Sequence, residues 1–330
     1  MMTTPRLRVF LTQPVAEGAL RRLREAADVT MNDDPLHMVT RDELAAGLRD
    51  ADVLFCLLHD RVDAQTLRGA PRLRLIASMA INPANLDVAA ATARGIPVTV
   101  IPPLVTEATA DVAFALLLAA ARRVVESDRL LRSGVFPGAQ SAHLVGGAVH
   151  GKVLGIIGLG AIGTAVARRA RGFGMRVLYT KRHRLSPSEE RDLGVEFVPL
   201  DRLLAESDFV SVHAPQTPET LHLIGEPQLR RMKPAAYLIN TSRGPLVDEA
   251  ALVTALTTGW IAGAGLDVYE HEPRVSPGLL DLPNVVLTPH IGSAERDTRE
   301  SIAGVVVDNI LAFARGKRPP NVLNPEVFER

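Results

Sequence analysis

The amino-acid sequence predicts an α/β protein with two domains, each built on a parallel sheet that helices cover. Short apolar runs typical of buried strands alternate with helical patterns almost throughout the chain, and this alternation indicates parallel sheets. The length of 330 residues exceeds one ordinary domain and suits two. A glycine-rich unit of strand, turn and helix begins only at Gly151, after several strand and helix patterns, so a second domain is expected to start well inside the chain.

Strands and helices are expected in alternating order along the chain. The first strand is expected at "LRVFLT", and the helix "AEGALRRLREA" that follows places Leu20, Leu23 and Ala26 on one apolar face. Later strands are expected at the apolar runs "ADVLFCLL", "LRLIASMA", "VLGIIG", "RVLYT", "FVSVHA", "AAYLINT", "IAGAGLDV" and "VVLTPH", with helices such as "AIGTAVARRARGFG" and "DEAALVTALTTGW" between them. We expect one long helix, Glu107 to Gly134, to lead into the second domain. The last helix, "RDTRESIAGVVVDNILAFARG", is expected to return to the first domain.

Composition and charge argue against several classes of protein. Hydrophobic residues make up 47% of the chain and charged residues 22%, so a sizeable core is expected. The 37 basic residues balance the 37 acidic ones, which gives no support for binding to nucleic acid or to a membrane surface. Cys56 is the one cysteine; a disulfide within the chain is therefore excluded, and we expect no metal site. The longest apolar run, Val112 to Ala121, is far shorter than the roughly 20 residues that cross a bilayer. Because the N-terminus shows no secretory signal either, we expect a soluble, cytoplasmic protein.

The turn "GLGAIG" has the spacing that holds a dinucleotide. Gly158 allows a tight turn, Gly160 allows the backbone to approach a pyrophosphate, and Gly163 allows the helix to pack closely on the strand. Ala161 and Ile162 begin the helix, whose N–H groups and partial positive charge favour phosphates. Glycines also make ordinary turns, which is the alternative. The strand before this turn, with the helix and strand after it, favours dinucleotide binding.

The second strand of this unit ends without the acid that usually binds the adenosine ribose of NAD. Thr180 stands near the expected position, and Lys181, Arg182 and Arg184 follow it. The absence of a carboxylate removes the repulsion of a 2′-phosphate, and these cations are suited to bind that phosphate directly. We therefore expect NADP(H) to be preferred, with NAD(H) also possible. The alternative is a solvated basic loop without a role in cofactor binding.

Four charged or titratable residues stand at or just after the ends of three later strands. They are Arg243 in "LINTSRGPLVDE", Asp267 and Glu272 in "AGLDVYEHEP", and His290 in "VVLTPHIGSAE". Ligands of open α/β sheets lie beyond the carboxyl ends of the strands, so these residues are candidates for an active site. Taken singly, Arg243 or Glu272 would more often be part of a structural ion pair, and His290 a buried imidazole whose hydrogen bonds are satisfied.

In this order and spacing, "GLGAIG", "HAPQTPET", "LINTSRGPLVDEAAL", "GAGLDVYEHEP" and "LTPHIGSA" resemble the D-isomer-specific 2-hydroxyacid dehydrogenase family. The resemblance covers nearly the whole chain, and "VLYTKRHR" is most similar to the glyoxylate/hydroxypyruvate reductase branch. It implies a Rossmann dinucleotide-binding domain, residues 102–293, inserted into a flavodoxin-like substrate and catalytic domain, residues 1–101 with 294–330. It also implies a homodimer formed through the nucleotide-binding domain. The segment "LRSGVFPGAQSAHLVGGAVHG" then serves either as an exchanged arm or as a mobile loop.

The resemblance implies a role for each residue at the strand ends. Arg243 would bind the carbonyl and carboxylate of a 2-oxo acid. His290 would donate the proton to the carbonyl oxygen, and Glu272 would fix its tautomer and favour the imidazolium. Asp267 would hold the nicotinamide carboxamide. The remaining cofactor contacts implied outside the glycine turn and the basic segment are Thr109, His213, Pro215, Thr241 and Gly292.

The predicted substrate loop departs from the pattern of the family. The loop reads "SMAINPANLD", with Asn82 where relatives commonly carry a glycine and Pro83 after it. Proline restricts the residue before it and lacks an N–H. An altered substrate pocket and a neutral change in a surface loop are both compatible with this. The other residues expected near the substrate are Leu58, Met79, Ala80 and Ile81, with Arg243 and His290 from the other domain.

The sequence thus predicts an oxidoreductase that reduces a small 2-oxo acid, of the glyoxylate or hydroxypyruvate type, to the D-2-hydroxy acid with NAD(P)H. Two alternatives remain. The first keeps the same machinery and acts on another anion, such as a phosphite or phosphonate. The second is a dinucleotide-sensing binding protein similar to the corepressors of this family, which carry long segments beyond the two domains.

Overall fold

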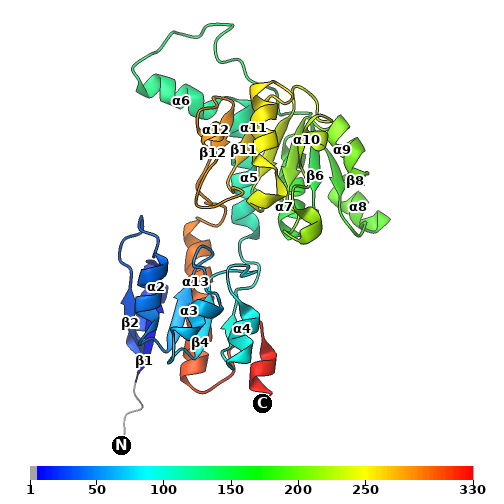
Figure 1. The fold of residues 1–330 in the computed structure, drawn as a ribbon. Helices are drawn as coiled ribbons and strands as arrows, with labels where there is room; N and C mark the ends of the chain where they lie inside the picture. The colour runs from blue at the N-terminus through cyan, green and yellow to red at the C-terminus, as the bar shows by residue number, and fades with distance from the viewer. Residues whose placement is uncertain (1–5, 330) are drawn as a thin grey trace, which may run out of the picture. The chain divides into compact units, whose positions relative to one another are not determined.

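The chain divides into two compact units in the computed structural model, which describes residues 6–329 (Figure 1). The first unit is Met1–Leu104 together with Ala294–Arg330, and the second is Val105–Ser293. Each unit contains one sheet whose strands are all parallel. The predicted α/β class is therefore confirmed, and the last helix does return to the first unit as expected.

Within the described residues, the first unit holds a five-stranded sheet in the order β2-β1-β3-β4-β5. Its strands are β1 (Leu7–Leu11), β2 (Ala27–Met31), β3 (Val53–Cys56), β4 (Leu75–Ser78) and β5 (Val98–Thr99). Both β3 and β4 are buried along their whole length, as strands covered on both faces by helices must be. Loops that follow the carboxyl ends of β3 and β4 carry the predicted substrate residues.

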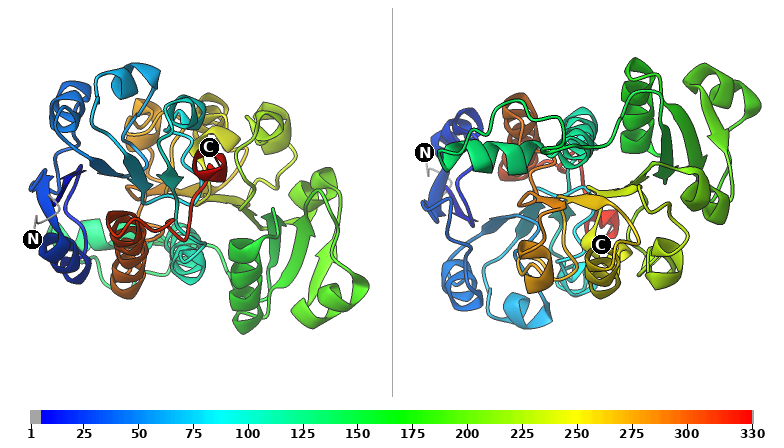
Figure 2. Two further views of the ribbon diagram at one scale, coloured as in Figure 1. Left: turned by 90° about the horizontal axis from the view of Figure 1, so that it is seen from below. Right: turned by 90° about the horizontal axis from the view of Figure 1, so that it is seen from above.

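Helices cover both faces of this sheet. They are α1 (Glu17–Ala26), α2 (Arg41–Leu48), α3 (Ala64–Arg68), α4 (Val88–Ala93) and α13 (Arg296–Ala314), with the short 3-10 helix η3 (Pro325–Phe328) near the end. Figure 2 shows α1 and α13 together on one face and α2 and α3 on the other. On the second face, Leu48, Leu54 and Leu67 pack in one apolar core with Cys56, whose thiol is buried.

The second unit holds a seven-stranded sheet in the order β12-β11-β10-β9-β6-β7-β8, again counted over the described residues. Its strands are β6 (Val153–Ile157), β7 (Arg176–Thr180), β8 (Val195–Phe197), β9 (Phe209–Val212), β10 (Tyr237–Asn240), β11 (Gly263–Leu266) and β12 (Val285–Leu287). Chain order reverses between β6 and β9, the place where ligands of such sheets bind.

Two apolar cores hold the helices of this unit on opposite faces of the sheet. The helical elements are α5 (Thr106–Ala121), α6 (Val124–Arg132), α7 (Ala161–Gly172), α8 (Pro187–Leu193), α9 (Leu200–Glu206), η1 (Pro218–Thr220), α10 (Glu226–Leu229), η2 (Gly244–Leu246), α11 (Glu249–Thr257) and α12 (Pro277–Leu280). One core joins α5 and α7 to residues such as Ile156 and Ile239. The other joins α9, α10 and α11 to residues such as Val210 and Leu238.

The prediction of one long helix from Glu107 to Gly134 is wrong, because the chain breaks between α5 and α6. Arg123 adopts a left-handed backbone with φ of 53°. The carbonyl of Ala121, which a continuous helix would use internally, instead accepts a hydrogen bond of 2.8 Å from the N–H of Gly147. A side chain at Gly146 would collide with that same carbonyl. The returning segment therefore ends α5, and Figure 1 shows α6 continuing into a long loop.

No helix in the described part of the chain is both long and apolar enough to cross a membrane. Even α5, the most apolar long helix, is only 16 residues long and begins with an acidic turn that includes Glu107. Its buried side chains, among them Phe114 and Leu117, belong to the core of the second unit.

Candidate active site

The glycine turn between β6 and α7 has the geometry that its sequence predicts. Gly158 has φ of +93°, and a Cβ there would lie 2.5 Å from the amide nitrogen of Ala214. A Cβ at Gly163 would lie 2.5 Å from the carbonyl oxygen of Gly158. Both positions therefore require glycine, whereas a Cβ at Gly160 would meet nothing within 4 Å. The backbone at Gly160 is consequently open to a ligand.

The start of α7 is prepared to receive an anion. Gly160 is the N-cap of this 12-residue helix and offers no side chain to its first turn. The first N–H groups of a helix lack partners inside the helix, so those of Ala161 and Ile162 point outward without a capping acceptor. Because they carry the positive end of the helix dipole, these residues fit the pyrophosphate of a dinucleotide.

The basic segment after β7 is only partly available to a ligand. Lys181 donates a hydrogen bond of 3.0 Å from Nζ to the carbonyl of Leu159 in the glycine turn. Arg182 is exposed and has no hydrogen-bonded or ion-paired partner within residues 6–329. The charge of Arg182 acts on Glu219. The pKa of Glu219 is lowered mainly by a hydrogen bond from Thr217 and, to a smaller extent, by Arg182.

Arg184 does not stand free for a phosphate, contrary to the interpretation of the sequence. Its Nε and Nη2 donate hydrogen bonds of 2.8 Å each to the two carboxylate oxygens of Glu190. A guanidinium whose fork already binds a carboxylate has little left to offer a second anion. The sequence pattern showed the cation but not the carboxylate, which lies six residues further along the chain.

Two polar residues at the ends of β9 and β10 complete the predicted cofactor contacts on this side. Burial lowers the pKa of His213 to about 4, so its imidazole is neutral at physiological pH. Its Nε2 lies 2.8 Å from Oγ of Ser211. Thr241 is buried, and its Oγ1 has no hydrogen-bond partner among the described residues. A buried hydroxyl without a partner is costly, which suits a position where a ligand completes the hydrogen bonding. Pro215 is exposed just beyond.

Arg243 is fixed by the turn that follows β10. Asn240 accepts a hydrogen bond of 3.0 Å from the N–H of Ser242 and donates one of 3.0 Å to the carbonyl of Arg243. A side chain at Gly244 would collide with the backbone of Tyr269, so only glycine lets this turn lie against the segment after β11. Burial lowers the pKa of Arg243, while the charge of Glu272 opposes that shift. The guanidinium has no carboxylate within 4 Å among the described residues.

His290 and Glu272 form a hydrogen-bonded pair. Nδ1 of His290 lies 2.9 Å from Oε2 of Glu272, and Oε1 of Glu272 accepts a 2.9 Å hydrogen bond from the N–H of Tyr269. Burial raises the pKa of Glu272. The hydrogen bond and charge of His290, the N–H of Tyr269 and the charge of Arg243 lower it by more, so the pKa lies below its ordinary value. The carboxylate is thus ionised and accepts from Nδ1, which leaves Nε2 for proton transfer.

Asp267 holds the turn that carries His290. Its Oδ1 accepts hydrogen bonds from Oγ1 of Thr288 at 2.6 Å and from the N–H of Ile291 at 2.8 Å. Its Oδ2 accepts one of 2.7 Å from the N–H of Gly292. His290 itself has φ of 53°, an unfavourable conformation for a side chain with a Cβ. The buried carboxylate therefore stabilises a strained turn, a role that the sequence pattern did not indicate.

The structure brings Thr109 of α5 to this same turn. A Cβ at Gly292 would lie 3.1 Å from Oδ2 of Asp267 and 3.5 Å from Oγ1 of Thr109. The sequence interpretation did not include Thr288 and Tyr269. In the structure, the hydroxyl of Tyr269 donates a 2.9 Å hydrogen bond to the carbonyl of Thr288. Both residues stand inside the quoted motifs, so their proximity to the charged residues was the available signal.

The predicted substrate residues lie on two neighbouring loops of the first unit. The side-chain amide of Asn85 donates to the carbonyls of Leu57, at 2.9 Å, and Asp60, at 2.6 Å. It thereby joins the loop of Leu58 to the loop of residues 79–82. Leu58 and Ile81 are exposed, at 38% and 40%. Ala80, by contrast, is buried at 3% and its side chain packs inward, so it offers a ligand no more than its backbone.

Asn82 does not adopt the left-handed backbone that favours glycine. It is absent from the positive-φ residues of the described chain, and its carbonyl accepts a hydrogen bond of 3.1 Å from the N–H of Ala84. Pro83 follows, and its carbonyl accepts from the N–H of Leu86 at 3.1 Å. The loop forms an ordinary turn, and Asn82 presents its side chain to solvent.

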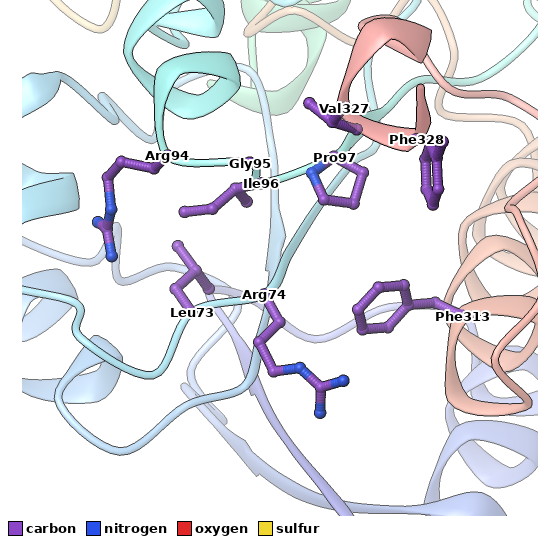
Figure 3. A pocket seen from close by; sticks show the side chains of 9 residues that line it. All are labelled: Leu73, Arg74, Arg94, Gly95, Ile96, Pro97, Phe313, Val327 and Phe328. Carbon is purple, nitrogen blue, oxygen red and sulfur yellow. The ribbon is translucent and has the colours of Figure 1, made fainter. Parts of the chain in front are cut away.

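A cavity of about 260 Å³ in the first unit lies apart from all the predicted site residues. Figure 3 shows Arg74 and Phe313 on its walls, with the Arg74 guanidinium 5.4 Å from the Phe313 ring centroid. Arg94 also lines it, but that side chain donates to the carbonyls of Leu67 and Ala70. Because its cations are occupied or solvated, we assign the cavity no role in the reaction. The described residues also contain no cluster of three or more His, Cys, Asp or Glu suited to a metal ion.

Comparison with known proteins places this geometry in context. Residues 114–292 match the protein-family model described as "D-isomer specific 2-hydroxyacid dehydrogenase, NAD binding domain". A glyoxylate reductase of Korarchaeum cryptofilum is 51% identical over 98% of this chain and 97% of its own. One from Thermococcus litoralis is 47% identical over 97% of this chain and 98% of its own.

The comparison of structures agrees with the comparison of sequences. An NADPH-dependent glyoxylate/hydroxypyruvate reductase of Sinorhizobium meliloti, solved in complex with NADP and malonate, superimposes with a TM-score of 0.78. It is 33% identical, and the match covers 97% of each chain.

Proposed function

Because this chain belongs to the D-isomer specific 2-hydroxyacid dehydrogenase family, we propose that it reduces glyoxylate or hydroxypyruvate to the D-2-hydroxy acid. Members of the family are NAD(P)-dependent oxidoreductases, and this chain is one. The relatives described above are named glyoxylate reductases, which supports a small 2-oxo acid as the substrate. The second unit, residues 102–293 by our assignment, binds the cofactor. The first, residues 1–101 with 294–330, supplies substrate contacts from Leu58 and residues 79–82.

The observation that carries the proposal is the pair His290–Glu272 beside an unpaired Arg243. Arg243 is half-buried, and its Nη1 donates a hydrogen bond of 2.7 Å to the carbonyl of Ser242. A guanidinium in this setting without a carboxylate partner attracts an anion, and its remaining donors fit the adjacent oxygens of a 2-oxo acid. His290, with Nδ1 bonded to Glu272, holds a proton at Nε2 for the carbonyl oxygen and takes it back in the reverse direction. Glu272 stabilises the charged imidazole, because it is already ionised above its lowered pKa.

The residues that would hold the cofactor in this proposal stand at the strand ends of the second unit. The glycine turn, with Gly160 open, would receive the pyrophosphate. Thr241 and Asp267 would hold the nicotinamide end, and Lys181 and Arg182 the adenosine end. The chemistry that a nicotinamide dinucleotide supplies when bound is a hydride for the carbonyl carbon. The unpartnered buried hydroxyl of Thr241 is the local sign that a bound group completes this site.

We propose that NADP(H) is preferred over NAD(H). Arg182 is exposed without a partner, and Lys181 uses only one donor, on Leu159. No acid follows Thr180 to accept from a ribose 2′-hydroxyl or to repel a 2′-phosphate. Arg182→Ala should lower kcat/KM for NADPH about tenfold, since a charge-assisted contact contributes about 1.5–3 kcal/mol, and leave the value for NADH unchanged. Arg191→Ala, another exposed arginine of the adjoining α8, serves as the matched control.

The substrate is tested by initial rates with glyoxylate, hydroxypyruvate and inorganic phosphite on the wild-type protein. We expect oxidation of NADPH with the two 2-oxo acids and no reduction of NADP with phosphite. Turnover of phosphite and none of the 2-oxo acids would favour the alternative oxyanion. Tight dinucleotide binding without turnover of any of the three would favour a sensing role.

We further propose a homodimer in the cytoplasm. Three large apolar side chains of α6 and the loop after it are exposed: Leu131 at 57%, Phe136 at 78% and Val145 at 63%. Large apolar side chains grouped on one projecting segment are typical of an interface. Light scattering should give twice the chain mass for the wild type and a lower mass for Phe136→Glu. An unchanged mass in the variant would argue that this segment is a solvated loop.

A further inference from the structure

We propose that Tyr179, Arg184 and Glu190 form a clamp that positions the cation loop, residues 180–185, and thereby sets the preference between the two nicotinamide dinucleotides. The inference rests on the proposed cofactor site but concerns residues that do not touch the cofactor. It assigns a positioning role to an arginine that the sequence pattern offers as a phosphate ligand, and to a carboxylate and a phenol that the pattern does not mark.

The clamp closes the cation loop on itself through one phenol oxygen. Tyr179, near the end of β7, donates a hydrogen bond of 2.7 Å from its hydroxyl to Oε1 of Glu190. The same hydroxyl oxygen accepts one of 2.9 Å from the N–H of Leu185. Arg184 binds both oxygens of Glu190 at 2.8 Å. The two ends of the loop are thus fixed at a single point beneath it.

Burial makes this arrangement rigid. Tyr179 is fully buried, Glu190 is 9% exposed, and the Tyr179 ring meets Phe197 edge to face with centroids 5.4 Å apart. The Arg184 guanidinium lies over the same Phe197 ring, also at 5.4 Å. The Arg184 side chain is itself 57% exposed, but it covers the buried pair of Tyr179 and Glu190. Buried polar groups whose hydrogen bonds are all satisfied specify one conformation. The loop is therefore held in place before any cofactor arrives.

The charges of the clamp are settled at physiological pH. The hydrogen bond from Arg184 is the main cause that lowers the pKa of Glu190 to about 2, with the hydrogen bond from Tyr179 second. Burial is the main cause that raises the pKa of Tyr179 to about 12. The carboxylate is charged and the phenol neutral, so the network keeps its hydrogen bonds between about pH 4 and pH 10.

The arrangement explains why the acid near this loop does not select NAD. Both oxygens of Glu190 are engaged from within, so none remains for a ribose 2′-hydroxyl. Of the three cations, Arg184 is consumed by that carboxylate, Lys181 is anchored at Leu159, and Arg182 is left exposed. The clamp neutralises one acid and one base together and leaves a net positive loop whose position is fixed.

The first experiment measures dissociation constants of NADPH and NADH by fluorescence titration on the intact protein, independently of any substrate. Tyr179→Phe removes only the hydroxyl and keeps the ring packing. We expect it to raise the dissociation constant of NADPH about tenfold, which is the effect of losing about one hydrogen bond. The dissociation constant of NADH should stay within twofold. Tyr237→Phe removes a hydroxyl from the same sheet, at β10, that has no hydrogen-bond partner among residues 6–329; it should change neither constant.

A second variant separates positioning from mere sequestration of Arg184. Glu190→Gln frees the guanidinium and loosens the loop, so we expect the preference for NADPH to fall. A preference that rises would mean that Glu190 only withholds a phosphate ligand, and would contradict the clamp. Thermal unfolding of each variant shows whether the fold is retained. Arg184→Ala, which breaks the clamp without releasing a cation, covers the case in which Glu190→Gln unfolds.

The outcomes distinguish this inference from the cofactor proposal beneath it. If the wild type prefers NADPH and Arg182→Ala removes that preference, but Tyr179→Phe and Arg184→Ala do not change it, the clamp is overturned and the cofactor site stands. If the wild type binds both dinucleotides equally, both are overturned.

Discussion

Two ends of the sheet in the second unit handle charge in different ways. At the end where we propose the catalytic residues, the turns after β10, β11 and β12, Arg243 has no carboxylate partner within 4 Å among residues 6–329, and backbone contacts hold its turn. At the other end, the cation loop pairs Arg184 fully with Glu190. Arg243 uses its Nη1 on the carbonyl of Ser242 and keeps its other donors for a ligand, whereas Arg184 uses its fork to fix the chain. Residue type alone therefore does not reveal which arginine binds an anion; the local supply of carboxylates does.

The two ends also differ in where strain is found. His290 has a left-handed backbone that the carboxylate of Asp267 stabilises through the N–H groups of Ile291 and Gly292. The cation loop contains no positive-φ residue among those described. Strained residues persist where the surroundings over-determine them, and they gather at functional sites. The difference fits the proposed roles, because a proton donor needs a more exact position than a loop that recognises a phosphate.

The largest effect is expected at the proton donor. His290→Ala should lower kcat for glyoxylate reduction by about 10²–10⁴, the range for general acid catalysis, because no other group holds a proton at that place. NADPH binding, measured by fluorescence, should stay within a few fold. Normal turnover in this variant would remove the catalytic end from the account.

A somewhat smaller effect is expected when the guanidinium fork is lost and its charge is kept. Arg243→Lys should lower kcat/KM for glyoxylate about 10- to 100-fold, since each charge-assisted hydrogen bond contributes about 1.5–3 kcal/mol. Both KM and kcat should change, because the fork binds the substrate and orients its carbonyl. Arg231→Lys, at a surface ion pair with Asp201, is the control and should be silent.

Replacement of the carboxylate beside the histidine should change the pH dependence of the reaction. The folded-state pKa of Glu272 is lowered, so its stabilising charge is fully present above the ordinary carboxyl range and is lost as pH falls through the lowered value. In Glu272→Gln, glyoxylate reduction should fail at a lower pH than in the wild type, because no carboxylate remains beside the imidazole. A pH profile identical to that of the wild type would contradict the role of the pair.

The acid side of the same variant provides an independent check. Between pH 6 and pH 3 the wild type should lose more stability than Glu272→Gln, since only the wild type has this carboxylate to protonate. Thermal unfolding at several pH values measures the difference. Equal slopes would mean that Glu272 contributes no pH-dependent stability.

The smallest effect is expected one step away from the reacting groups. Thr288→Val removes the 2.6 Å hydrogen bond to Asp267 and should cost about 1 kcal/mol of stability, with kcat lowered only a few fold. Thr257→Val, on the exposed face of α11, where the hydroxyl bonds only the carbonyl of Val253, is the matched control. A loss of kcat as large as that of His290→Ala would mean that Thr288 acts in the chemistry directly.

Much of this architecture could be predicted from the sequence, because alternating apolar runs directly reflect strands buried on both faces. The glycine turn was predictable because its requirement is local: Gly158 and Gly163 lie where a Cβ would collide with backbone atoms. The helix break at Arg123 was not, because its cause is a distant segment, Gly146 and Gly147, that takes the carbonyl of Ala121.

The candidate site shows the same division between local and distant causes. Arg243, Glu272 and His290 stand in motifs whose order alone suggested a site. The bracing role of Asp267 and the capture of Arg184 by Glu190 depend on hydrogen bonds between turns. Such bonds follow from tertiary packing, which periodicity and composition do not encode. Ala80 is the corresponding case in the first unit: the sequence predicted a contact with the substrate, but its side chain is buried.

The most direct test of the central claim is the product of hydroxypyruvate reduction. Wild-type protein is incubated with NADPH and hydroxypyruvate, and the two enantiomers of glycerate are quantified against the NADPH consumed. We predict one D-glycerate for each NADPH, because Arg243 and His290 hold the substrate with one face of its carbonyl directed to the hydride donor. Formation of L-glycerate, of a racemic mixture, or of no glycerate would contradict it.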